Sequence, residues 1–398
     1  MSERPVPVLF SGKDTCCACG ACLNICPMDA VSMEEDDCGF RYPKIDESRC
    51  VRCGRCKAVC AFQHTDVPNS PVATFAAVAR DRELASRSAS GGIFAALAKK
   101  IAAQGGVVFG AAMKPDFSVC HRACEQDSLA VLQGSKYTQS DTVLTFREAK
   151  AALEQGKTVL YSGTPCQIDG LKSFLGRDYT NLLTADIICH GVPNGRMFRD
   201  YIDSLGKAHG GAVEHFTFRD KRIGWGENGS AVIGGKRVKI WQSGASYPYY
   251  FSHGDLQRES CYRCPYACSH RPADLTLGDF WGIEKQHPEY LGRGGWDESE
   301  GISVVVANTK KGEDFLAVCD DMIDCKPSKF EKAAAGNAQL CRPVAGGKRD
   351  EIMQTYRDGG WDALEKRYES NIGFHKHASR VKSMLPKALK RKLKAGKK

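Results

Sequence analysis

The feature that most constrains this chain is a cysteine motif that occurs twice within its first 60 residues. Each copy has the spacing Cys-x2-Cys-x2-Cys-x3-Cys, and the copies comprise Cys16, Cys19, Cys22 and Cys26, followed by Cys50, Cys53, Cys56 and Cys60. A loop with a thiolate at every third residue wraps one corner of an iron–sulfur cubane, while the fourth Cys reaches the other cluster. This pattern predicts two 4Fe-4S clusters, one on Cys16, Cys19, Cys22 and Cys60 and the other on Cys50, Cys53, Cys56 and Cys26.

Disulfide bonds and zinc sites are the two alternatives to iron–sulfur clusters in a chain with this many cysteines. The chain has 398 residues and 20 Cys, but its first ten residues have neither a basic start nor a long apolar segment. No apolar run approaches the ~18 residues of a membrane span. We therefore expect a cytoplasmic protein without a transmembrane segment, in which thiols stay reduced and bind metal. Zinc sites usually pair two Cys-x2-Cys knuckles across a longer gap, so the repeated crossing pattern favours iron–sulfur. Cys17 and Cys38 fall outside the spacing, and their roles stay open.

The charge of the chain is concentrated at its end. The formal net charge is +9, yet residues 376–398 hold ten Lys or Arg and no acid, so the rest has 46 basic and 47 acidic residues and sums to −1. The body has no basic stripe of the kind that nucleic-acid-binding proteins carry, so we expect no nucleic-acid partner. The tail is interpreted as a solvated basic segment, although an acidic lipid or protein is an alternative partner for it.

The remaining patterns divide the chain into three parts. We predict a two-cluster 4Fe-4S ferredoxin-type domain at 10–64, a linker at 65–72, a main domain at 73–350 and a helical, basic tail at 351–398. Alternating helical and apolar strand patterns between residues 75 and 189 indicate a parallel sheet with crossover helices. Residues 213–220 and 230–243 have the character of antiparallel strands, and residues 303–309 of a further core strand. The expected fold class is an α+β ferredoxin-like domain followed by an α/β domain with a mostly parallel sheet and an antiparallel excursion.

A second group of cysteines is dispersed through the main domain. Cys166 and Cys189 each follow a predicted strand, and parallel strands place both at the same carboxyl edge of the sheet, where ligands bind. Cys261 and Cys264 form a Cys-x2-Cys pair in a later loop and would complete a four-thiolate site, with Cys268 as a competing ligand. Spacing alone leaves open whether these residues hold a third cluster or are buried thiols beside a separate knuckle.

Two glycine-containing segments are candidates for binding phosphate. Residues 87–92 (Arg-Ser-Ala-Ser-Gly-Gly) precede an apolar helix, so Ser90 would cap the helix while Gly91 and Gly92 let a phosphate approach its N–H groups. Lys136 and Tyr137 follow Gly134 and would suit a dinucleotide. A simple helix cap and a solvated turn are the alternatives. The glycine fingerprint of the classical dinucleotide fold is absent. His190, beside Cys189, is the one His that stands out, and a structural role is favoured for it.

Taken together, the motifs resemble the coenzyme F420 hydrogenase/dehydrogenase beta-subunit family. The resemblance rests on RSASGGIF (87–94), GSKYTQS (134–140), SGTPCQIDGLKSFL (162–175), CHGVP (189–193), FRDK (218–221), CYRC (261–264) and ADLTLGDFWG (273–282). It implies an iron–sulfur flavoprotein with Cys166, Cys189, Cys261 and Cys264 as ligands of a third 4Fe-4S cluster. The resemblance assigns no role to Cys268. It also implies FAD near Ser88, Ser90, Gly91, Gly92, Lys136 and Tyr137.

The resulting hypothesis is a flavin-dependent iron–sulfur oxidoreductase that exchanges electrons with ferredoxin or another redox protein. Clusters carry one electron at a time and flavin carries two, so FAD would connect that carrier to a hydride-type substrate or a deazaflavin-type cofactor. A non-catalytic electron-transfer subunit of a larger redox complex is the first alternative, and bound flavin distinguishes the two. A zinc-bound interaction module is the second alternative. The physiological substrate, the direction of electron flow and the oligomeric state are not written in the sequence.

Overall fold

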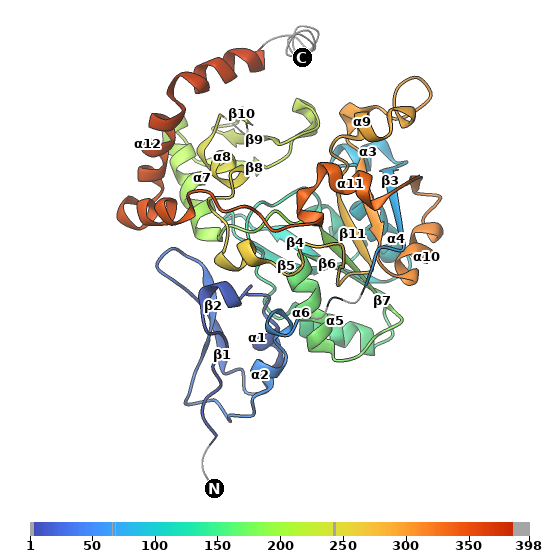
Figure 1. Ribbon diagram of the computed structural model, residues 1–398, viewed down its shortest axis with the longest axis vertical. Helices are drawn as coiled ribbons and strands as arrows, with labels where there is room; N and C mark the ends of the chain where they lie inside the picture. Colours follow the sequence, from blue (N-terminus) through green and yellow to red (C-terminus); the bar gives the residue numbers. More distant parts are fainter. Residues whose placement is uncertain (1–3, 66, 68, 242–243, 385–398) are drawn as a thin grey trace.

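The computed structural model describes residues 4–384 apart from residues 66, 68, 242 and 243, with side chains as far as residue 372 (Figure 1). Residues 4–64 form a small α+β unit at one end of the molecule, drawn in blue at the bottom of Figure 1. Its elements are η1 (Lys13–Thr15), α1 (Ala21–Ile25), β1 (Val31–Glu35), β2 (Arg41–Ile45), α2 (Arg55–Ala58) and η2 (Ala61–Gln63). β1 and β2 form an antiparallel hairpin in which Val31 lies opposite Ile45.

An eight-stranded sheet forms the centre of the molecule. Its strand order is β13-β3-β12-β11-β7-β6-β4-β5, and the strands are β3 (Ala73–Ala79), β4 (Val107–Met113), β5 (Val119–Cys124), β6 (Val159–Gly163), β7 (Leu182–Ile187), β11 (Leu275–Asp279), β12 (Ser303–Ala307) and β13 (Ile323–Ser328). The four strands β4, β6, β7 and β11 are parallel, whereas the other four pairings are antiparallel. The predicted parallel order therefore holds in the centre of the sheet, and both of its edges are antiparallel.

Helices cover both faces of this sheet because consecutive strand residues point to opposite sides. Val108 and Leu160 pack in the cluster that contains α4 (Ile93–Ala103) and α10 (Lys310–Val318). Their neighbours Phe109 and Tyr161 pack with α5 (Thr145–Glu154) and α6 (Pro165–Leu175). The second cluster also includes Cys17, Cys19, Ala21 and Val59 of the amino-terminal unit. The small unit is thus joined to the body through the core that underlies α5 and α6.

The chain between β7 and β11 builds a second layer. β8 (Val213–Thr217), β9 (Asn228–Ile233) and β10 (Lys236–Trp241) form a three-stranded antiparallel sheet in the order β10-β9-β8. This sheet is the predicted antiparallel excursion. It packs with α7 (Gly195–His209), α8 (Ser246–Ser252) and the last helix α12 (Arg349–Met384) around an aromatic core that includes Phe198, Tyr201, Phe216 and Trp361. The remaining helices are α3 (Arg82–Ser86), α9 (Ile283–Gln286) and α11 (Phe330–Gly336).

The carboxyl-terminal tail is helical as far as the structure describes it. α12 is bent in Figure 1, and Gly360 within it has a φ of 62°. That left-handed conformation has little cost for Gly and a substantial one for other residues, so the bend is encoded locally. Residues 385–398, which contain much of the predicted basic tail, lie outside the described residues. No helix among the described residues is both long and apolar enough to cross a membrane.

Candidate functional site

The two cysteine motifs fold into loops with the same backbone path. The second residue after the first Cys is left-handed in both copies, with φ values of 54° at Ala18 and 55° at Arg52. Glycines follow the second Cys of each copy, and Gly20 and Gly54 have φ values of 84° and 76°. α1 and α2 begin directly after these glycines. Left-handed turns of this kind fold backbone N–H groups around a concavity that suits an anionic group.

The structure brings the fourth Cys of each motif to the other motif. Burial raises the pKa of the Cys22 thiol, and the neighbouring thiols of Cys19, Cys16 and Cys60 raise it further. Burial likewise raises the pKa of Cys56, with added contributions from Cys26 and Cys50. A small cavity is lined by Cys26, Cys50, Cys53 and Cys56. The eight cysteines therefore form two crossed groups, which we call the inner group (Cys16, Cys19, Cys22 and Cys60) and the outer group (Cys26, Cys50, Cys53 and Cys56).

The four dispersed cysteines of the main domain also come together. Cys166 is the second residue of α6, which follows β6, and Cys189 follows β7, the parallel neighbour of β6. Burial raises the pKa of the Cys189 thiol, and Cys261, Cys166 and Cys264 raise it further. Burial together with Cys166 and Cys261 raises the pKa of Cys264 to about 12. We call these four residues the third group.

Local backbone geometry explains why the segments that carry Cys189 and Cys261 lie close together. Gly191 has a φ of 80°, and a Cβ atom at this position would lie 2.6 Å from Cγ of Gln257 and 3.1 Å from Cβ of Cys261. Only Gly therefore lets the loop after Cys189 approach the turn that carries Cys261. The N–H of Arg258 donates to the carbonyl of Val192 at 2.9 Å and joins the same two segments.

Cys268 does not join the third group. Its thiol donates to the carbonyl oxygens of His270 and Pro265, at 3.2 and 3.4 Å. Cys17 instead lies between two groups, since the neighbouring thiols of Cys166 and Cys19, together with burial, raise its pKa. Cys17 is in turn the largest cause of a lowered pKa at Cys166. The inner and third groups are thus adjacent, separated in part by a single thiol.

Beside the third group lies a cavity of about 300 Å³. It opens at the carboxyl edge of the central parallel strands, and its wall includes Gly163 of β6, Ile187 of β7 and Asp279 of β11. Cys166 and Cys189 form part of the same wall. The volume is within the range of small-molecule and cofactor sites, and the carboxyl edge of parallel strands is where open α/β sheets bind ligands.

Two family models match parts of the chain that contain these cysteines. Residues 15–64 match the family model described as a 4Fe-4S dicluster domain. Residues 156–331, which contain the whole third group, match the model for the carboxyl-terminal part of the coenzyme F420 hydrogenase/dehydrogenase beta subunit. The chain thus contains a 4Fe-4S dicluster domain and a domain similar to the carboxyl-terminal part of the coenzyme F420 hydrogenase/dehydrogenase beta subunit. The first match is to an iron–sulfur domain and the second is to a family of oxidoreductase subunits.

No curated protein matches the chain. Among solved structures, it is similar to a chain of the F420-reducing nickel–iron hydrogenase complex from Methanosarcina barkeri, described in a study of xenon derivatization. The identity is 17%, the TM-score is 0.45, and the match covers 77% of this chain and 94% of the other.

Five of the six residues predicted to lie near FAD line the cavity: Ser88, Ser90, Gly92, Lys136 and Tyr137. Gly91 lies behind the wall, since its N–H donates to Oγ of Ser303 at 2.9 Å and a Cβ atom would lie 2.4 Å from the carbonyl oxygen of Ala77. Ser90 does not cap α4 as predicted, because its hydroxyl donates to the carbonyl of Ile302 at 3.0 Å and the N-cap residue is Gly92. The first N–H groups of α4 therefore have no side-chain cap at the cavity.

Lys136 and Tyr137 are more constrained than the sequence suggests. The Lys136 ammonium donates to the carbonyls of Gln133, Leu132 and Val131 at 2.8, 2.9 and 3.3 Å, which occupies all three of its N–H donors. Burial lowers the pKa of Lys136 to about 7. The Tyr137 ring stacks on Phe251 with ring centroids 4.8 Å apart. Both residues therefore form part of the cavity wall. The Lys136 ammonium, when charged, has no N–H donor left for a ligand.

Several wall residues have no signal in the sequence that marks them as functional. The His121 ring is fixed by Oγ of Ser140 at 2.8 Å and the carbonyl of Ser162 at 2.9 Å, and burial lowers its pKa to about 4. Arg219 forms a two-pronged ion pair with Asp279, one contact of which is 3.0 Å. Arg219 and Asp279 fall in the FRDK and LGDFW segments that carry the family resemblance. That coincidence is the one clue that could have identified this pair.

The donor sets fit clusters better than they fit single ions. Each group offers four thiols and no other ligand type, as a cubane requires. Within the part of the chain that the structure describes, no three His, Cys, Asp or Glu side chains converge closely enough to hold one metal ion. A cubane spreads its four thiolates around several iron atoms, whereas zinc gathers all its ligands at about 2.3 Å.

Proposed function

We propose that this chain is a cytoplasmic iron–sulfur flavoprotein oxidoreductase. In this proposal it exchanges single electrons with ferredoxin or another redox protein, and electron pairs with a hydride-type substrate or deazaflavin-type cofactor. The observation that carries the proposal is the cavity, whose wall contains Cys166 and Cys189 together with the uncapped start of α4. A pure electron relay would not need a ligand cavity of about 300 Å³ beside its last cluster.

In this proposal the three cysteine groups each hold one 4Fe-4S cluster. The inner and outer clusters belong to a dicluster domain at 10–64, the third cluster and FAD to a domain at 73–350, and a helical, basic tail completes the chain at 351–398. Cys53 of the outer group is exposed, Cys17 links the inner group to the third, and the third group borders the cavity. This order supports a linear path from the surface to the cavity.

The residues around the cavity suit FAD in distinct ways. The uncapped N–H groups at the start of α4 would donate hydrogen bonds to the pyrophosphate, as helix N-termini bind anions. Bound FAD would supply the conversion between one-electron and two-electron transfer. His190 lines the cavity next to Cys189, and burial lowers its pKa, which favours the neutral ring. The Arg219–Asp279 pair keeps a fixed positive and negative charge in the same wall.

The test is the content of iron, acid-labile sulfide and released flavin per chain, in protein purified without oxygen. We expect about twelve iron atoms and one flavin, as three cubanes and one FAD require. About eight iron atoms without flavin would instead indicate a two-cluster relay subunit. A colourless protein with bound zinc would overturn the iron–sulfur assignment altogether.

A further inference from the structure

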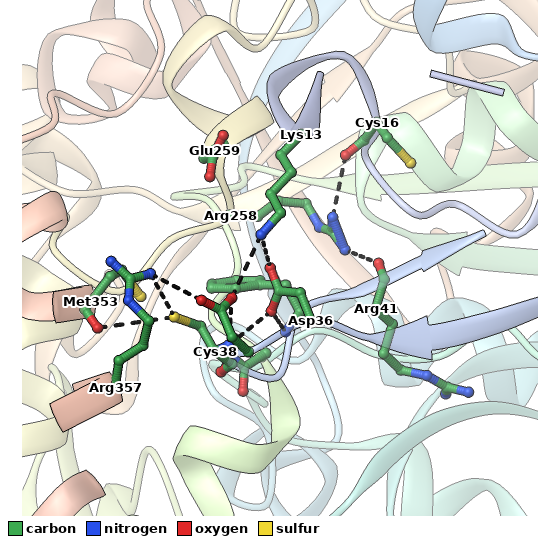
Figure 2. Close-up of polar contacts among 12 residues, drawn as sticks. Lys13, Cys16, Asp36, Cys38, Arg41, Arg258, Glu259, Met353 and Arg357 are labelled. Atoms are coloured by element: carbon green, nitrogen blue, oxygen red, sulfur yellow. Dashed lines mark hydrogen bonds and ion pairs between the residues drawn. The ribbon is translucent and has the colours of Figure 1, made fainter. Parts of the chain in front are cut away.

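Arg258 is a fully buried cation between the inner and third groups. It precedes the turn that carries Cys261 and Cys264, and it is 0% exposed. Its guanidinium donates to the carbonyl of Cys16 at 3.3 Å, to Oε1 of Gln139 at 3.2 Å and to the carbonyl of Arg41. Figure 2 shows the side chain reaching both carbonyls of the amino-terminal unit. The guanidinium also lies 4.3 Å from the ring centroid of Tyr42.

All of these partners are electrically neutral. Among the residues that the structure describes, no Asp or Glu forms an ion pair with Arg258, and the adjacent Glu259 pairs with Arg349 at 3.5 Å instead. A buried charge without a counter-charge is strongly unfavourable, so such groups are normally paired or coordinated. The position of Arg258 therefore calls for negative charge that the carboxylates of the described residues do not provide.

The thiols supply that charge once they are deprotonated. The Arg258 cation acts electrostatically on Cys16 of the inner group and on Cys166 and Cys261 of the third group. A 4Fe-4S cluster with four thiolates carries about −2 when oxidised, and each further electron adds one negative charge. A cation near both sites lowers the free energy of the reduced clusters more than that of the oxidised clusters, because Coulomb attraction grows with charge.

We propose that Arg258 is the shared counter-cation of the inner and third clusters and raises the reduction potentials of both. This inference rests on the proposed function. Each reduction moves one electron from a donor to one cluster, the donor is oxidised by one electron, and no bond to Arg258 forms or breaks. The outer cluster has no part in this arrangement, so electrons from the surface would move toward the more favourable inner and third clusters.

The experiment is a redox titration of the loaded full-length protein followed by electron paramagnetic resonance. Arg258→Gln should lower the midpoint potentials of two clusters, with at least a tenfold fall in the reduced-to-oxidised ratio at fixed potential, which is about 59 mV for a one-electron couple. The outer cluster should keep its potential. Signals are assigned with Cys166→Ser, which lacks the third cluster.

Two further variants separate charge from folding. Gln139→Glu leaves Arg258 in place but puts a carboxylate where Oε1 of Gln139 accepts from Nε of Arg258 at 3.2 Å, so it should lower the same two potentials. Arg147→Gln is the matched control, because Arg147 also binds carbonyls of the amino-terminal unit but already pairs with Asp29 at 2.8 Å. It should leave the potentials of the inner and third clusters unchanged.

The possible outcomes decide the inference. Unchanged potentials in both Arg258→Gln and Gln139→Glu, a shift of only one cluster, or an equal shift of the same two clusters in Arg147→Gln would overturn it. General unfolding of both variants would also overturn it, since Arg258 would then act on the fold. Loss of iron from the inner and third groups alone would support it. Fewer than three clusters in the unaltered protein would defeat the proposed function instead, and that content is measured first.

Discussion

At the residue scale, Cys166 is the position at which a substitution should affect the third group and leave the other two groups intact. It lies at the start of α6, and its thiol contacts Oγ1 of Thr164 at 3.2 Å. Cys166→Ser should remove one cluster and leave about eight of about twelve iron atoms, because the Ser hydroxyl is a poor replacement for a thiolate ligand. Iron and sulfide analysis measures this. Cys268→Ser is the control and should keep every cluster, since that thiol binds only carbonyls. Loss of all iron, or of none, would contradict the assignment of Cys166.

A second residue-scale prediction concerns pH and Lys136. Its pKa of about 7 lies below the ordinary value of 10.5, so it gains its charge as the pH falls through 7. An anionic flavin phosphate stabilises the charged form, so binding takes up a proton and flavin affinity should fall as the pH rises from 6 to 8. Lys136→Met should abolish this slope and weaken binding about tenfold at pH 6, a cost of about 1.4 kcal/mol. Titration of flavin fluorescence measures it.

The matched control is Lys172→Met. Burial also lowers the pKa of Lys172, but this residue lies on α6 outside the cavity wall. The pH slope should therefore persist in Lys172→Met. If both variants keep the slope, or both lose it, the charge of Lys136 does not govern flavin binding.

At the scale of elements, a buried ion pair joins the end of β7 to the segment before β11. Arg271 binds Oδ1 of Asp186 at 3.1 Å, the carbonyl of Tyr266 at 2.7 Å and the carbonyl of Ile187 at 2.8 Å. Arg271→Ala would leave Asp186 as a buried charge without its partner, so the free energy of unfolding should fall by about 3–5 kcal/mol. Urea unfolding measures this.

The control for Arg271→Ala is a substitution in an ion pair on the surface. Lys310 pairs with Asp314 at 2.8 Å on the exposed side of α10. Lys310→Ala should change the free energy of unfolding by less than about 1 kcal/mol, because water screens exposed pairs. A similar loss in both variants would show that the Asp186–Arg271 pair does not hold the two segments together.

At the scale of the whole molecule, electrons would enter through the amino-terminal unit, which lies at one end of the molecule (Figure 1). Around the exposed Cys53, the side chains of Val8, Met28 and Val51 are 68%, 43% and 58% exposed. Arg49, Arg55 and Lys57 are also exposed in this region. An apolar patch with basic residues around it is complementary to an acidic electron carrier. We therefore expect an acidic ferredoxin to reduce the protein at this surface.

Charge reversal tests that entry point. Arg55→Glu combined with Lys57→Glu should slow reduction by an acidic ferredoxin about tenfold at low salt, because electrostatic steering is lost. The difference should shrink at about 0.5 M salt, where screening is strong. Stopped-flow absorbance measures the rate, and Lys310→Glu on α10 is the control. Equal rates for all three proteins, or a difference that does not depend on salt, would place the entry point elsewhere.

The sequence by itself predicted the elements whose patterns are local. β6, α6 and β7 follow the alternation of strand and helix predicted between residues 75 and 189, and β12 lies within the strand predicted at 303–309. These segments are readable because a buried strand or helix needs a recognisable run of side chains. β5 and β13 have no such run. Their pairing with β4 and β3 at the edges of the sheet is what makes them strands.

The same division applies to the site. Spacing alone specified the inner and outer groups, since the ligands of each motif are close in the chain and a short helix limits where the fourth Cys lies. The third group, the cavity, the position of Cys17 and the burial of Arg258 depend on residues up to 242 positions apart, as in the hydrogen bond from Arg258 to Cys16. Strand order predicted that Cys166 and Cys189 share one sheet edge. It carries no signal for the contacts of Cys17 and Arg258, because only the packing of the amino-terminal unit against α6 and the Cys261 turn brings those side chains within reach.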